Sequence, residues 1–129
     1  MAYKLLLADD EKETVELLQK RLIKEGYEVT VAFDGEEALA KIKESNPDVV
    51  LLDLDMPKRN GYEVLKEIRE KFKDKWRPVI IFTGKGGIEA LEKCYNMEAD
   101  HYLTKPCNME AILQAIRTMI SLIPARAKV

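Results

Sequence analysis

The sequence predicts an α/β fold in which a parallel five-stranded sheet lies between two layers of helices. Five short apolar runs recur along the chain, at residues 5–8, 29–32, 49–52, 79–82 and 102–103. The segments between these runs place apolar residues at the spacing of amphipathic helices. Strands that alternate with helices favour a parallel sheet, and uninterrupted apolar strands favour a sheet that is covered on both faces.

Each predicted helix follows one of the apolar runs. The first has Val15, Leu18 and Leu22 on one face, at positions i, i+3 and i+7. The four later helices show similar apolar stripes, in chain order at Ala38, Leu39 and Ile42, at Leu65, Ile68 and Phe72, at Ala90, Leu91 and Cys94, and at Ile112, Ala115, Ile116, Met119 and Ile123.

Polar residues and one glycine predict where the helices begin and end. Asp10 and Asp34 each stand three positions before a glutamate, which is the spacing of a capping box with a carboxylate as its first member. Asn60 and Asn108 are predicted to open the third and fifth helices. Gly26 is predicted to end the first helix, because glycine readily adopts the left-handed conformation that follows a helix.

Composition indicates one compact domain. The 129 residues carry 21 basic and 23 acidic side chains, so bulk charge attracts the domain neither to nucleic acid nor to a membrane surface. No apolar run is long enough to span a bilayer, and the first residues lack the features of a signal peptide.

Cys94 and Cys107 have no metal-binding or redox spacing, which favours reduced thiols in the cytoplasm. The domain is predicted to cover residues 1–123, with 124–129 as a short tail or linker stub.

Polar side chains gather where the predicted strands end. They follow four of the five runs, as Asp9, Asp10, Asp53, Asp55, Thr83 and Lys105. Ligands of open parallel sheets bind at this edge, and clustered carboxylates repel one another unless a cation lies between them. Mg²⁺ and Mn²⁺ prefer such oxygen ligands, while lysine and threonine suit a phosphoryl group. Because an aspartate can act as a nucleophile, the edge could accept a phosphoryl group on a carboxylate.

Four motifs in the same order resemble a known family, the receiver domain of response regulators in two-component signalling. They are LLLADDE, DVVLLDLDMPKRNGYEVL, PVIIFTG and ADHYLTKP, and the resemblance extends from Lys4 to about Leu122. It implies a flavodoxin-like (βα)5 fold with strand order 2-1-3-4-5, similar to the chemotaxis regulators. It also implies a signalling phosphoacceptor that catalyses its own phosphotransfer and autodephosphorylation, rather than a conventional enzyme.

The resemblance implies partners as well as a fold. A histidine kinase or a histidine phosphotransfer protein would donate the phosphoryl group. An unknown downstream protein would read the face formed by helix 4, strand 5 and helix 5. No direct binding of nucleic acid or membrane by this domain is expected. The family allows either a stand-alone receiver or a piece of a longer regulator.

By position, the resemblance assigns the acceptor and the metal ligands. Asp53 corresponds to the phosphoacceptor. Asp9 and Asp10 correspond to the acidic pair that holds Mg²⁺ or Mn²⁺, with Asp10 the more direct ligand. The main-chain carbonyl of Asp55 corresponds to a further ligand.

The resemblance also assigns the residues that respond to phosphorylation. Thr83 corresponds to the switch hydroxyl, Lys105 to the phosphoryl-binding lysine and Tyr102 to the aromatic switch residue. A cis peptide is expected between Lys105 and the proline that follows it. Asp55 and Lys85 flank the phosphoryl site, and if their side chains pair they would tune the lifetime of the phosphoryl group.

Three other functions fit parts of the sequence. A phosphatase of the haloacid-dehalogenase type has a DxD motif after a buried strand, but its pattern continues with Thr or Val where this chain has Met56. A flavodoxin-like FMN binder needs a phosphate loop rich in glycine and hydroxyl groups after the first strand, where this chain has ADDEKE. A pseudo-receiver has the fold without phosphorylation and usually lacks a key residue, whereas all of them are present here.

Overall fold

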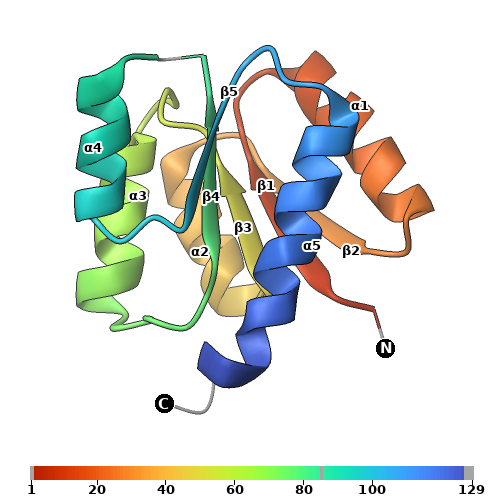
Figure 1. The fold of residues 1–129 in the computed structure, drawn as a ribbon. Coiled ribbons are helices and arrows are strands. Elements are labelled where there is room, and N and C mark those ends of the chain that lie inside the picture. The colour runs from red at the N-terminus through yellow and green to blue at the C-terminus, as the bar shows by residue number, and fades with distance from the viewer. Residues whose placement is uncertain (1, 85, 127–129) are drawn as a thin grey trace.

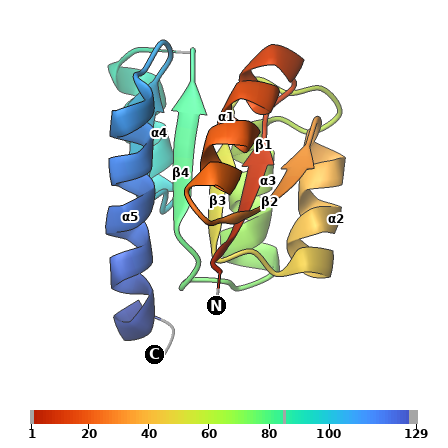
Figure 2. The same cartoon turned by 90° about the vertical axis from the view of Figure 1, so that its right-hand side faces the viewer.

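Five parallel strands form the centre of the protein. The computed structural model describes residues 2–84 and 86–126. The strands are β1 (Lys4–Ala8), β2 (Glu28–Ala32), β3 (Val49–Leu52), β4 (Val79–Thr83) and β5 (His101–Thr104), and their order in the sheet is β2-β1-β3-β4-β5 (Figures 1 and 2). The predicted fold class and strand order are therefore confirmed.

Helices cover both faces of this sheet. They are α1 (Lys12–Lys24), α2 (Gly35–Ser45), α3 (Gly61–Lys66) with the π-helical turn η1 (Glu67–Lys71), α4 (Ile88–Asn96) and α5 (Met109–Arg126). One face packs against α1 and α5, and the other packs against α2, α3 and α4 (Figure 1). None of the described helices combines the length and the hydropathy that crossing a bilayer requires.

The central strands are almost entirely apolar because their side chains alternate between two buried layers. In β1, Leu5 and Leu7 face α1 and α5, while Leu6 and Ala8 face the other helical layer. All four are at most 2% exposed. A strand with one face in water would show alternation of polar and apolar residues instead.

Three of the four predicted helix starts are confirmed. Asp34 Oδ1 accepts a hydrogen bond from the third residue of α2 at 2.8 Å, Asn60 forms a full capping box with Glu63, and Asn108 Oδ1 accepts from Ala111 N at 2.8 Å. The prediction for Asp10 was wrong, because α1 begins at Lys12 and its N-cap residue is therefore Glu11, whose side chain makes no capping hydrogen bond.

Gly26 ends α1 as predicted. Its φ of 99° lies in the left-handed region, and its N–H donates to Ile23 O at 3.0 Å. The next N–H, from Tyr27, donates to Leu22 O at 3.1 Å. These two bonds form a Schellman motif, which satisfies carbonyls at the end of the helix.

Three segments differ from the sequence-based expectation. The third helix ends in a π-helical turn, in which Phe72 N donates to Glu67 O five residues earlier at 2.9 Å. Because proline cannot continue a central strand, Pro57 predicts the end of the third strand, but β3 already ends at Leu52 and Pro57 lies in the following loop. Helix α5 continues through Pro124 to Arg126, where a tail was predicted. The domain boundary itself stays a prediction, and residues 127–129 lie outside the described part of the chain.

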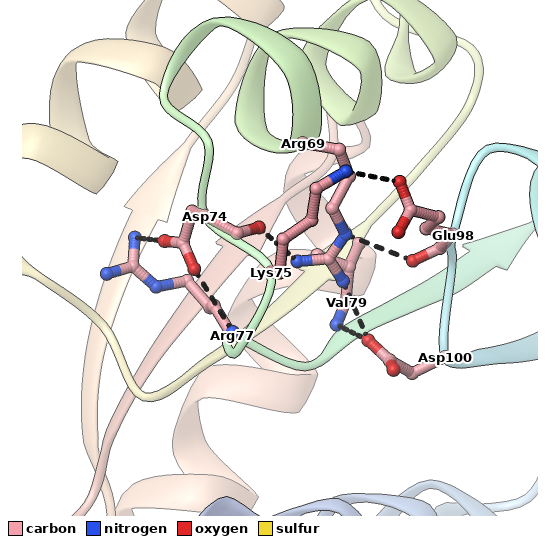
Figure 3. A network of polar contacts seen from close by, with 7 residues as sticks. All are labelled: Arg69, Asp74, Lys75, Arg77, Val79, Glu98 and Asp100. Atoms are coloured by element: carbon pink, nitrogen blue, oxygen red, sulfur yellow. Dashed lines mark hydrogen bonds and ion pairs between the residues drawn. The ribbon is translucent and has the colours of Figure 1, made fainter. Parts of the chain in front are cut away.

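A polar network joins η1, the segment between α4 and β5, and the beginning of β4, at the edge of the sheet where the strands begin (Figure 3). The Arg69 side chain, only 2% exposed, donates to Asp74 O at 2.8 Å, to Glu98 O at 3.0 Å and to Asp100 Oδ2 at 2.8 Å. The same Asp100 oxygen accepts from Val79 N at 2.8 Å. The network lies opposite the edge that carries the candidate site.

Candidate phosphoryl-acceptor site

The site lies at the edge where the parallel strands end. An open pocket of about 710 Å³ is bounded by the segments after β1, β3 and β4. Its lining residues are Asp10, Glu11, Asp53, Asp55, Met56, Pro57, Thr83 and Gly84. The sheet thus brings together residues that are far apart in the sequence, as the strand-end pattern predicted.

Three carboxylates form the acidic part of the site. Oxygens of Asp9, Asp10 and Asp53 all lie within 4.8 Å of one another. Asp9 and Asp53 are 5% and 4% exposed, whereas Asp10 is open to solvent. Burial raises the pKa of the Asp9 carboxyl, and the hydrogen bond from Lys105 offsets part of that rise. An all-oxygen, strongly negative cluster of this kind fits a hard divalent cation.

Lys105 supplies positive charge next to the carboxylates. Its Nζ lies 2.7 Å from Asp9 Oδ2, 2.7 Å from Glu11 Oε1 and 3.2 Å from Asp53 Oδ2. Burial alone would lower the pKa of Lys105, but the hydrogen bonds to Asp9 and Glu11 outweigh this effect and raise it. The ammonium is therefore charged at physiological pH, and it lies beside the Asp53 carboxylate.

The loop after β3 holds Asp53 through main-chain contacts. Asp53 N donates to Ala8 O at 2.9 Å, and Asp53 Oδ1 accepts from Asp55 N at 3.2 Å. The first residue of α3, Gly61, packs so close that an added Cβ would lie 2.3 Å from Asp53 O. Only glycine allows the start of α3 to approach the Asp53 segment this closely.

Thr83 and Tyr102 occupy different places. Thr83, the last residue of β4, is fully buried and lines the pocket, and its carbonyl accepts from Lys105 N at 2.8 Å. Tyr102 is half-buried in β5 and packs against the apolar layer formed with α2, α3 and α4. The peptide between Lys105 and Pro106 is cis, as expected.

Only one member of the predicted pair of Asp55 and Lys85 belongs to the described part of the chain. Asp55 is exposed and lines the pocket. Lys85 lies outside the described residues, so their pairing stays a prediction.

Sequence reasoning missed Glu11. This residue both lines the pocket and accepts a hydrogen bond from Lys105. The sequence shows only that Glu11 is the third acid of the ADDE run, which begins at the last residue of β1. This adjacency does not show which way the Glu11 side chain points.

The fold and the site together define a class of protein: a five-stranded doubly wound domain with an acidic pocket and a lysine at the ends of its strands. The family model for the response regulator receiver domain matches residues 5–117. The chain belongs to this family. It is a signalling phosphoacceptor rather than a conventional enzyme, and receiver domains of this kind work with kinases or phosphotransfer proteins.

Solved structures agree with this assignment. A CheY-like response regulator receiver domain protein from Methanospirillum hungatei has a TM-score of 0.90 at 28% identity, over 97% of this chain and 98% of that one. The chemotaxis protein CheY4 of Vibrio cholerae has a TM-score of 0.86 at 31% identity, over 92% and 99%. A CheX–CheY–BeF3–Mg²⁺ complex from Borrelia burgdorferi gives 0.82 at 32% identity, over 90% and 87%.

Proposed function

We propose that Asp53 is the residue that accepts the phosphoryl group. The observation that carries this proposal is its position, since its carboxylate is 5% exposed, belongs to the acidic cluster and lies 3.2 Å from Lys105 Nζ. Among the described carboxylates, only Asp53 belongs to the acidic cluster, contacts Lys105, lines the pocket and also follows the end of a central strand.

The proposed reaction is transfer from a phosphohistidine of a histidine kinase or phosphotransfer protein. A carboxylate oxygen of Asp53 attacks phosphorus, and the P–N bond breaks with its electron pair returning to the imidazole. Lys105 neutralises charge on the transferring oxygens. Mg²⁺, or Mn²⁺, held by Asp10, Asp53 and the Asp55 carbonyl with Asp9 nearby, would add further charge neutralisation and orient the donor. Water later hydrolyses the aspartyl phosphate.

The signal is proposed to pass through Thr83 and Tyr102 to a protein surface. The Thr83 hydroxyl bonds the phosphoryl group, and Tyr102 turns inward behind it. This shift alters the face formed by α4, β5 and α5, which a downstream protein reads. The exposed apolar side chains of Ile88, Leu91 and Tyr95 on α4 support a protein-binding role for that face.

Two further parts of the proposal concern lifetime and location. Asp55, which lines the pocket, and Lys85, two positions after Thr83 in the sequence, would tune the lifetime of the phosphoryl group. The cytoplasm is the proposed location, because the free thiols of Cys94 and Cys107 are kept reduced there.

The test is intact-mass spectrometry after incubation with Mg²⁺ and phosphoramidate. The wild type is expected to gain a single phosphoryl adduct that is lost on standing, and Asp53→Ala is expected to gain none. Glu13→Ala serves as the control, since it removes an exposed carboxylate that does not line the pocket. An adduct of equal yield on Asp53→Ala would assign the acceptor elsewhere.

A further inference from the structure

The ammonium group of Lys105 has three protons and three carboxylate neighbours. Nζ lies 2.7 Å from Asp9, 2.7 Å from Glu11 and 3.2 Å from Asp53. Because a lysine has three donors, each proton has one acceptor. The contact with Asp53 is the longest of the three, so the two shorter bonds fix the direction of the proton that faces the acceptor.

Glu11 differs from the other two neighbours. Asp9 and Asp53 belong to the acidic cluster that fits a cation, and Glu11 does not. A cation in that cluster competes with Lys105 for the oxygens of Asp9 and Asp53. Because Glu11 is not one of the carboxylates of that cluster, its bond with Lys105 does not compete directly with a cation there.

The main chain of Glu11 is well anchored although its side chain is 59% exposed. Its N–H donates to Asp9 Oδ1 at 2.9 Å, and its carbonyl accepts from Val15 N at 3.0 Å in the first turn of α1. The side chain therefore reaches Lys105 from a fixed point at the beginning of a helix.

We propose that Glu11 is a positioning residue, which holds Lys105 so that the ammonium faces the phosphoryl group on Asp53 when the acidic cluster is occupied. This inference rests on the function proposed above. Glu11 does not touch the reacting atoms, and it acts only through Lys105. The alternative role for an acid at this place is repulsion of the anionic donor, which would slow phosphorylation instead of supporting it.

Three variants separate these roles. Glu11→Ala removes the hydrogen-bond acceptor and the charge, whereas Glu11→Gln keeps a weaker, neutral acceptor. Glu13→Gln is the matched control, because Glu13 is an exposed acid in the first turn of α1 outside the pocket lining. It changes the local charge by the same amount as Glu11→Gln.

The first measurement is the rate of adduct formation as a function of phosphoramidate concentration at saturating Mg²⁺. Loss of one charge-assisted bond predicts a maximal rate about tenfold lower in Glu11→Ala and about threefold lower in Glu11→Gln. The donor concentration at half-maximal rate stays unchanged, and Glu13→Gln behaves as the wild type. An equal or higher maximal rate in Glu11→Ala overturns the inference, as does a loss in Glu13→Gln equal to that in Glu11→Gln.

The second measurement needs no metal and no donor. In protein labelled with ¹⁵N-lysine, slow exchange of the Lys105 ammonium protons with water reports its hydrogen bonds, and Lys105→Arg assigns the signal. Exchange is expected to be faster in Glu11→Ala and unchanged in Glu13→Gln. Unchanged exchange in Glu11→Ala contradicts the contact. If the wild type forms no adduct at all, the proposed function fails, while this measurement still decides whether Glu11 holds Lys105.

Discussion

Gly61 shows how one residue without a side chain determines the shape of the acceptor site. A Cβ at this position would lie 2.3 Å from Asp53 O and 2.7 Å from Leu54 Cα, which are both main-chain atoms. Gly61→Ala gains about 1 kcal/mol of helix propensity but forces backbone movement that typically costs about 1–3 kcal/mol or more. Because the contacts are with main-chain atoms, we expect a cost at the upper end of this range and a net loss of about 1–2 kcal/mol in the free energy of unfolding, measured by urea denaturation.

The control for this prediction is Gly86→Ala. A Cβ there has no described atom within 4 Å, and its φ lies outside the left-handed region. A surface change of this kind should alter the free energy of unfolding by no more than about 0.5 kcal/mol. Equal effects of the two substitutions would contradict the steric argument for Gly61.

The sequence predicted which residues meet at the site but not how they bond. Asp9, Asp10, Asp53, Thr83 and Lys105 were predicted to meet because the ends of parallel strands share one edge, and the structure places all five there. The contact of Lys105 with Glu11 depends on the direction of two long side chains. Sequence spacing carries no information on such directions, so this partner was missed.

At the scale of the elements, the π-helical turn η1 holds a buried charge. Its Arg69 is 2% exposed and bonds Asp100, which lies between α4 and β5 and also accepts from Val79 N (Figure 3). Asp100→Ala leaves the guanidinium and the β4 amide without this acceptor. Removing one partner of a buried pair typically costs about 3–5 kcal/mol, and since Asp100 is 17% exposed we expect about 3 kcal/mol.

Glu98→Gln is the comparison for Asp100→Ala. Its side chain pairs with Lys75 at 2.6 Å, but both side chains are more than half exposed, so the pair contributes at most about 1 kcal/mol. The bond from Arg69 goes to the main-chain carbonyl of Glu98, which the substitution keeps. Denaturant unfolding of both variants should therefore show a several-fold larger loss for Asp100→Ala.

Most elements could be predicted from the sequence, and the exception η1 depends on contacts between residues that are distant in the sequence. Buried runs such as β3 and capped helices such as α2 carry strong short-range signals. The π-helical turn η1 does not, because its extra residue per turn leaves the apolar stripe of Ile68 and Phe72 almost unchanged. It coincides with Arg69, whose polar contacts lie 5–31 residues away in the sequence. Such long-range bonds could not be inferred from local spacing.

At the scale of the whole molecule, the acidic cluster links stability to metal binding. Three carboxylates within 4.8 Å repel one another, and the Lys105 ammonium contacts Asp9 and Asp53 of the three. A cation that binds only the folded state stabilises it by about 2.7 kcal/mol at a hundredfold excess over its dissociation constant. The melting temperature should therefore rise with the logarithm of the Mg²⁺ concentration once the site begins to fill.

Asp10→Asn should raise the melting temperature without Mg²⁺ and reduce the increase that Mg²⁺ produces. Without Mg²⁺ the variant is expected to melt at a higher temperature than the wild type, because one of the three repelling charges is gone. With increasing Mg²⁺ it should gain less, so the two melting curves cross. Asp55→Asn is the control, since it removes an exposed carboxylate and keeps the main-chain carbonyl, and it should retain most of the Mg²⁺ effect. An Asp10→Asn variant that gains as much as the wild type would show that Asp10 does not hold the cation.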